Sequence, residues 1–149
     1  MTHWVQNSIF YHIYPLGFCG APAQNDFSAA PVERLNKISG WLDHIQNLGV
    51  NALYLGPVFE ASRHGYDTVD YYAIDRRLGT QDSLRRLVED CHRRGIRVVL
   101  DGVFNHVGRD FWAFRDVQQY GASSAYARWF QNLRFGTPSP YGDAFSYEG

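Results

Sequence analysis

The sequence is poor in cysteine, lacks a long hydrophobic run and has almost no net charge. Its 149 residues include two cysteines, Cys19 and Cys91, and 14 basic against 15 acidic side chains. Two distant thiols exclude a disulfide scaffold and a paired metal-binding motif. No apolar stretch could span a bilayer, and the balanced charge excludes an electrostatic footprint for nucleic acid or a membrane surface. The first residues do not resemble a signal peptide, so we expect a cytoplasmic protein.

Aromatic residues, in contrast, are abundant. The chain holds four Trp, ten Tyr and ten Phe, together 16% of its residues, and 45% of the residues are hydrophobic. This composition excludes a disordered chain and predicts a domain with a sizeable core. Flat rings with polar edges suit the faces of sugars, although most aromatic side chains in any domain fill the core. Composition alone leaves both roles open.

Strand and helix patterns alternate along most of the chain. Apolar, β-branched and aromatic runs predict three strands, and three- and four-residue spacing predicts two helices that each end at a glycine. The strands are expected at 9–14, 50–55 and 96–100, the helices at 32–48 and 80–94, a long loop at 58–79, and two short helices at 110–119 and 123–131 before an irregular tail. This order predicts an α/β fold with a parallel sheet, whose second and third strands are buried on both faces.

Such a sheet has a physical problem, because its outer strands leave backbone groups unpaired. A closed (β/α)8 barrel removes these edges, but it needs eight units and about 250 residues. We therefore expect either a small open sheet or the opening part of a longer barrel. In both cases the open edges predict self-association or a complementing partner that supplies the missing strands.

Two polar segments follow the second and third strands, where parallel α/β folds place their sites. Residues 63–72 and 101–106 supply carboxylates, imidazoles, an amide and tyrosine rings to one rim. Such side chains can hydrogen-bond and stack on a polyhydroxylated ligand. Structural roles explain the pattern equally: Asp101 could cap loop amides, Asn105 could form a turn and His106 could be a packed histidine. Spacing alone predicts only a polar site on a β/α scaffold.

Four segments carry a resemblance to a known family. Residues 101–106 (DGVFNH) resemble the D-x-V-x-N-H motif on the third strand of the alpha-amylase family of glycoside hydrolases, and residues 10–15 (FYHIYP) resemble its first strand. Residues 64–67 (HGYD) and 111–117 (FWAFRDV) resemble most closely the neopullulanase and cyclomaltodextrinase branch. The resemblance implies the first three β/α units of a (β/α)8 TIM barrel, residues 1–107, and the start of the domain inserted after strand three, residues 108–149.

The resemblance also implies roles for individual residues. Tyr66 would stack on the glucose ring that precedes the scissile bond. His106 would bond a hydroxyl of the same ring and stabilise charge in the transition state. Asp101 would be a structural carboxylate of the active site, and Asp67 a nearby polar support. Asn105 would support the start of the inserted domain and could ligate calcium; no cofactor is otherwise implied.

The family implies a retaining hydrolase or transglycosylase that acts on maltooligosaccharides, cyclodextrins or related α-glucans. Retaining enzymes use two carboxyl groups about 5–5.5 Å apart. In this family the nucleophile and the acid/base lie on the fourth and fifth strands, which the sequence does not include. We therefore expect the chain to supply substrate-binding residues and, alone, to have no amylolytic activity.

Other functions stay open at this point. A non-catalytic glucan-binding or assembly fragment would keep the fold without the chemistry, and a reading frame that continues into strands with an Asp and a Glu would argue against it. A metal-dependent hydrolase would use Asp101, His106 and His64 as ligands, but the sequence lacks the usual paired-histidine spacing. No G-x-G-x-x-G motif follows a strand, which disfavours a nucleotide-binding fold.

Overall fold

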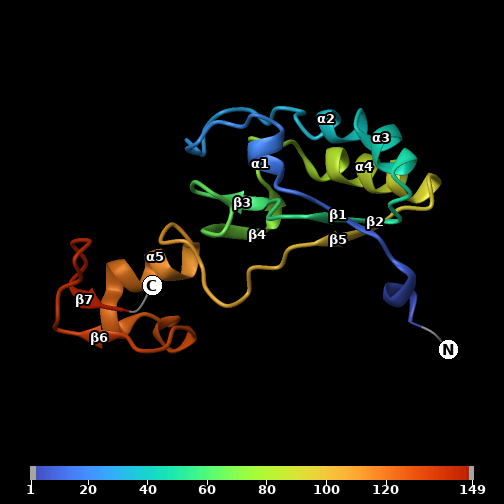
Figure 1. Ribbon diagram of the computed structural model, residues 1–149. Coiled ribbons are helices and arrows are strands. Elements are labelled where there is room, and N and C mark those ends of the chain that lie inside the picture. The colour runs from blue at the N-terminus through green and yellow to red at the C-terminus, as the bar shows by residue number, and fades with distance from the viewer. Residues whose placement is uncertain (1–2, 148–149) are drawn as a thin grey trace.

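A parallel sheet of three strands forms the centre of the fold. The computed structural model describes residues 3–147. The strands pair in the order β1-β2-β5 (Figure 1), with bounds β1 Phe10–Ile13, β2 Ala52–Leu55 and β5 Arg97–Leu100. The register sets His12 beside Tyr54 and Tyr54 beside Val99. The predicted strands and their parallel pairing are confirmed, so their three carboxyl ends lie at one edge of the sheet.

Helices cover one face of this sheet (Figure 1). A 3₁₀ turn, η1 (Trp4–Asn7), precedes β1, and the α-helices of this part of the chain are α1 Pro15–Phe18, α2 Asn36–Ser39, α3 Leu42–Asn47 and α4 Gln81–Arg93. The main core lies between sheet and helices and includes Ile13, Leu35, Ile38, Leu42, Ile45, Leu53, Leu55, Leu87 and Ile96. Each such buried side chain stabilises the fold by about 1.5–3 kcal/mol before the entropy of ordering is subtracted.

The opposite face of the sheet is open. On this face the Arg97 side chain of β5 is exposed and the Phe10 side chain of β1 is 44% exposed, while Leu100, on the helical face of β5, is also exposed. The expectation that the third strand is buried on both faces is therefore wrong. Its physical reason is that β5 has a single neighbouring strand within residues 3–147, and the helices lie on one side only.

The helix predicted over 32–48 is broken in the structure. Its apolar spacing is real, because Ile38 and Ile45 are fully buried. However, helical structure starts only at α2, and Gly40 lies between α2 and α3. Glycine has a low helix propensity, so the segment divides into two short helices that still present the same apolar face to the sheet.

Helix α4 confirms the second helical prediction. Thr80 caps its first turn: the Ser83 backbone N–H donates to Thr80 Oγ1 (3.2 Å), and the Thr80 N–H donates to Ser83 Oγ (2.8 Å). This reciprocal pair satisfies two otherwise unpaired donors at the helix start. No helix within residues 3–147 is both long and apolar enough to cross a membrane.

The segment 58–79, predicted as a loop, contains an antiparallel hairpin. Strand β3 (Phe59–Ala61) pairs with β4 (Thr68–Ile74), with irregular register around Glu60. The sequence shows no clean alternation here because charged residues occupy buried positions: Glu60 is only 5% exposed. Arginine partners make that burial tolerable, which a hydrophobicity pattern cannot reveal.

The C-terminal part forms a second, smaller core. Helix α5 (Trp112–Tyr120) confirms the helix predicted at 110–119. The helix predicted at 123–131 is wrong, because only the 3₁₀ turns η2 (Gly121–Ser123) and η3 (Ala127–Trp129) form there. The tail pairs β6 (Arg134–Phe135) with β7 (Phe145–Ser146). Contacts between aromatic rings, mostly edge-to-face, hold this core together. They join Phe114, Phe130, Phe145 and Tyr147.

A buried arginine connects the hairpin with two loops. The Arg77 guanidinium binds Asp75 through Nε (2.9 Å) and Nη2 (2.6 Å), and both side chains are at most 5% exposed. Nη1 also donates to the backbone carbonyls of Pro22 (3.0 Å) and Arg63 (2.7 Å), and Nη2 donates to that of Ala61 (3.2 Å). One side chain thereby fixes the relative positions of the hairpin, the loop after α1 and the loop after β3.

Replacing Arg77 by methionine should lower the free energy of unfolding by about 3–5 kcal/mol, because it leaves the buried Asp75 carboxylate without its partner. Urea unfolding followed by circular dichroism measures the change. The matched control is Arg85→Met, since Arg85 pairs with Asp82 at the surface, where their side chains are 64% and 67% exposed, and such exposed pairs contribute at most about 1 kcal/mol. Equal losses in the two variants would show that the buried network does not stabilise the fold.

Candidate active site

The centre of the site is the Asp101 carboxylate, directly after β5. Its backbone N–H donates to the Leu55 carbonyl (2.9 Å), which continues the sheet pairing by one residue. The Tyr54 hydroxyl, from the neighbouring strand β2, donates to Asp101 Oδ2 (2.9 Å). Since Leu53 and Leu55 are buried in the core on the helical face, alternation turns Tyr54 toward the open face.

His12 extends this arrangement onto β1. Its ring stacks on that of Tyr54, with 4.7 Å between centroids and 23° between planes. His12 on β1, Tyr54 on β2 and Asp101 directly after β5 thus lie at the same edge of the sheet. Sequence reasoning missed the first two residues. The sequence does contain a signal for them. Each of two otherwise apolar strands carries a polar ring at a position that alternation places on the same face of the sheet.

Tyr66 reaches the same carboxylate from the turn between β3 and β4. Its side chain is 40% exposed. Partial burial raises the pKa of Tyr66, and the charge of Asp101 and a hydrogen bond to it raise that pKa further. The Tyr54 pKa is also raised, chiefly by its hydrogen bond to Asp101. Two phenols from different elements therefore face one carboxylate, which favours their neutral, proton-donating form.

His106, in the loop after β5, lies against the turn that carries Tyr66. Its Nε2 is 2.8 Å from the Tyr66 carbonyl oxygen, and its Nδ1 is 3.4 Å from Nδ2 of Asn105. The imidazole and the Tyr66 turn are therefore held together, and His106 remains exposed to solvent. The structure thus brings together Tyr66, Asp101 and His106, whereas the side-chain contact of Asn105 is with His106.

Close backbone packing joins the two loops. The Gly108 N–H donates to the Thr68 carbonyl (2.8 Å), and a Cβ on Gly108 would lie 2.4 Å from the Asp67 carbonyl oxygen. Only glycine fits at this distance. The Asp67 carboxylate accepts the Gly65 N–H (3.0 Å), so Asp67 shapes the turn that carries Tyr66.

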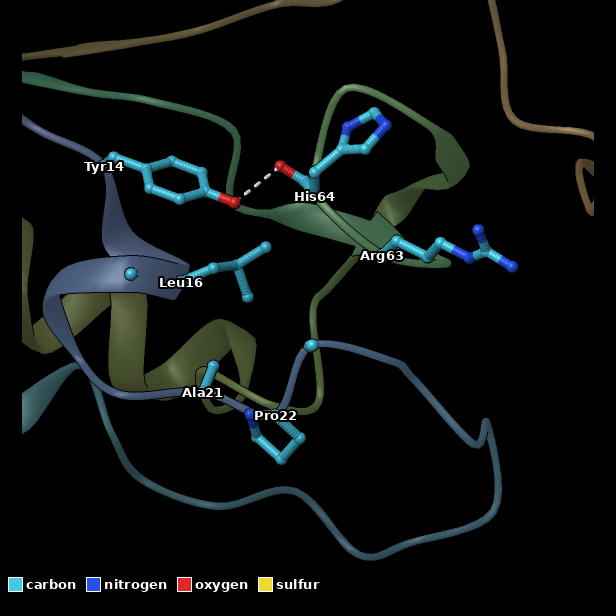
Figure 2. Close-up of a pocket in the computed structure, with 8 residues that line it drawn as sticks. Tyr14, Leu16, Ala21, Pro22, Arg63 and His64 are labelled. Atoms are coloured by element: carbon cyan, nitrogen blue, oxygen red, sulfur yellow. Dashed lines mark hydrogen bonds between the residues drawn. The ribbon is translucent and has the colours of Figure 1, made fainter.

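A hollow of about 250 Å³ adjoins the Tyr66 turn. Figure 2 shows its walls, with Tyr14 and Leu16 facing His64 across it and Ala21 and Pro22 below. The Tyr14 hydroxyl donates to the His64 carbonyl (2.9 Å), which ties the end of β1 to the Tyr66 turn. The space next to the site is thus lined mainly by apolar groups.

The side chains do not converge as metal ligands do. Within residues 3–147, no group of three or more His, Cys, Asp or Glu side chains is placed to hold a metal ion. His64 Nδ1 accepts from the Tyr66 N–H (3.2 Å) and His106 Nε2 meets the Tyr66 carbonyl, so neither points to Asp101 as a shared ligand set would. The metal-hydrolase alternative therefore has no support among the described side chains, and a calcium contact of Asn105 stays a prediction.

Comparison with known proteins identifies the family. Residues 12–148 match the family model of the alpha amylase catalytic domain. The chain belongs to the alpha-amylase family. The match places this α/β chain in the TIM-barrel fold of that family, and the resemblance noted in the sequence is confirmed.

Individual members of the alpha-amylase family agree with the predicted branch. The chain is 45% identical over 141 residues to a cyclomaltodextrinase of Bacillus sp. and 41% identical over 142 residues to neopullulanase 2 of Thermoactinomyces vulgaris. Each alignment covers 85% of this chain but only 25% and 24% of the respective relative. The cyclic alpha-maltosyl-(1→6)-maltose hydrolase of Arthrobacter globiformis, in complex with that sugar, superposes with a TM-score of 0.79 at 37% identity, over 97% of this chain and 36% of the other.

Replacing Asp101 by asparagine should lower the pKa of both Tyr54 and Tyr66. A neighbouring carboxylate disfavours the phenolate, so removing its charge lets both phenols ionise at lower pH. Ring-carbon NMR titrations of the tyrosines measure the shift. Tyr147 is the internal control, because burial and its bond to Asp143 raise its pKa instead. Unchanged titration of Tyr54 in the variant would contradict the described geometry.

Proposed function

We propose that the chain is the substrate-binding portion of a retaining α-glucan hydrolase or transglycosylase that acts on maltooligosaccharides, cyclodextrins or related α-glucans. The observation that carries this proposal is the convergence of Tyr66, Asp101 and His106 at the carboxyl ends of parallel strands. TIM-barrel enzymes place their active sites at this edge. The names of the relatives supply the class of substrate.

The side chains suit one glucose ring. The exposed Tyr66 ring offers an apolar face to the C–H groups of a sugar, while the Asp101 carboxylate accepts bonds from hydroxyl groups. Tyr54 orients that carboxylate, and His12 supports the Tyr54 ring from behind. His106 Nε2 donates to the Tyr66 carbonyl, so a sugar hydroxyl that reaches His106 donates to Nδ1 in place of the Asn105 amide. Binding through a rigid ring and pre-oriented polar groups lowers the entropy cost of association.

The chain on its own should bind without cleaving. Retention requires a nucleophilic carboxylate and an acid/base about 5–5.5 Å apart. Asp101 is engaged by Tyr54 in a positioning role. The buried Glu60 is held by Arg76, and Glu33 by Arg86. We therefore assign the nucleophile and acid/base to further strands of the complete barrel.

The two hydrophobic cores support a division of the chain into barrel residues 1–107 and inserted-domain residues 108–149. The first core lies between sheet and helices, and the second includes Phe111, Phe114, Val117 and Phe145. A non-catalytic glucan-binding or assembly fragment is the alternative function for the same site.

We propose that the protein is located in the cytoplasm. Both cysteines are free and buried, and burial raises the pKa of each thiol to about 11. Free, unreactive thiols suit a reducing compartment.

Replacing Tyr66 by alanine should weaken maltotetraose binding about tenfold, because the stacking ring is lost. The amide NMR signal of His106, followed during titration with maltotetraose, reports the affinity at this site. Tyr66→Phe keeps the ring and should retain most of the binding. Tyr141→Ala, at another exposed tyrosine, is the control. Equal affinity of Tyr66→Ala and the unmodified chain would contradict the proposed function.

We also propose that the open edges and face of the sheet bind a second copy or the remaining strands of the barrel. Analytical ultracentrifugation of the chain alone should therefore show a dimer or larger species. Phe10→Lys places a charge on the β1 edge and should shift the population toward monomer. Leu48→Lys, at an exposed position outside the sheet, should not. A compact monomer at all concentrations would contradict this proposal.

A further inference from the structure

A second hollow lies on the other side of the hairpin. It measures about 390 Å³, and residues of β3, β4 and the start of α4 line it together with Pro31. Alternation along β4 separates it from the active-site side: Tyr71 contacts the rings of Phe104 and Phe111, whereas Tyr72 points the opposite way. The Tyr72 side chain is 88% exposed, the most exposed of the large apolar and aromatic side chains within residues 3–147.

Two polar side chains clamp the backbone of Tyr72. Asp70 Oδ1 accepts the Tyr72 N–H (2.7 Å), and Gln81 Nε2 donates to the Tyr72 carbonyl (2.7 Å). Both side chains are thereby held in place beside the exposed ring. Each keeps one oxygen, Asp70 Oδ2 and Gln81 Oε1, without a hydrogen-bond partner in the described part of the chain. These oxygens are pre-oriented acceptors.

Arg76 supplies the donors. Glu60, which is buried, holds the Arg76 Nε at 2.5 Å from its Oε1 and also accepts the Arg76 backbone N–H (2.8 Å). The two terminal guanidinium nitrogens have no hydrogen-bond partner among residues 3–147. The charge of Arg76 is offset by Glu60, and Asp70 adds a further negative charge, so the hollow does not suit an anion. An aromatic ring with both acceptors and donors around it suits a neutral polyhydroxylated ligand.

We propose that Tyr72, Asp70, Gln81 and Arg76 form a second carbohydrate-binding site, separate from the Tyr66 site, which holds one ring of an α-glucan chain on the face of Tyr72. Sugar hydroxyls donate to Asp70 Oδ2 and Gln81 Oε1 and accept from Arg76. This inference shares with the proposed function only the class of ligand. Helix α4 contributes only the Gln81 side chain, and the site does not use the backbone N–H groups at the helix start, where Thr80 and Ser83 form the cap.

Residue-resolved amide NMR with maltotetraose tests the proposal. Two separate groups of signals should respond, one around His106 and one over residues 70–81. Tyr72→Ala should weaken binding at the second group about tenfold and leave the first unchanged. Tyr72→Phe, which keeps the ring, should retain the binding, as should Tyr120→Ala at an exposed tyrosine outside the hollow.

Three results would overturn the second site. The signals of residues 70–81 could fail to respond to maltotetraose, or respond equally in Tyr72→Ala. They could also move with protein concentration in the absence of sugar, which would assign the surface to contacts between copies of the chain. Tyr66→Ala separates the two claims. If this variant loses the His106 response and keeps the response at residues 70–81, both sites are supported. If the unmodified chain responds only at His106, the second site alone is contradicted.

Discussion

The site depends on the parallel pairing of β1, β2 and β5. Parallel strands end at the same edge, so three residues far apart in the sequence, His12, Tyr54 and Asp101, become neighbours. The pairing also fixes which face each side chain takes. Leucines that alternate with Tyr54 enter the core beneath the helices, and the polar rings are left on the open face. A shift of one residue in this register would exchange the two sets.

The remaining site residues come from loops, and two constraints outside the site hold those loops in place. Arg77 is held by the buried Asp75 carboxylate and donates to backbone carbonyls of the hairpin and of the loop after α1. Gly108 lets the loop after β5 approach the Asp67 backbone more closely than any other residue would allow. Loops on a rigid sheet are a common way to carry a binding site, and here buried polar contacts supply the rigidity that hydrophobic packing does not.

The sequence predicted those parts of the fold that follow from hydrophobic periodicity. The strands and α4 have clear patterns and strong boundaries, such as the Thr80 cap. The hairpin was missed because Glu60 and Asp75 are buried with arginine partners, and such pairing is visible only in three dimensions. Tyr66, Asp101 and His106 were recognised through motifs, whereas Tyr54 and His12 lie within strands that resemble core. Their importance depends on the register between strands, which a single sequence does not specify.

We propose that this chain holds the glucan-binding part of an alpha-amylase family site without the carboxylate pair that breaks the bond. The most direct test is prolonged incubation of the purified chain with maltotetraose, with the sugar analysed by chromatography and its binding measured in the same samples. We expect saturable binding and intact maltotetraose. Dose-dependent release of glucose, maltose or maltotriose would contradict the proposal, as would the absence of any binding.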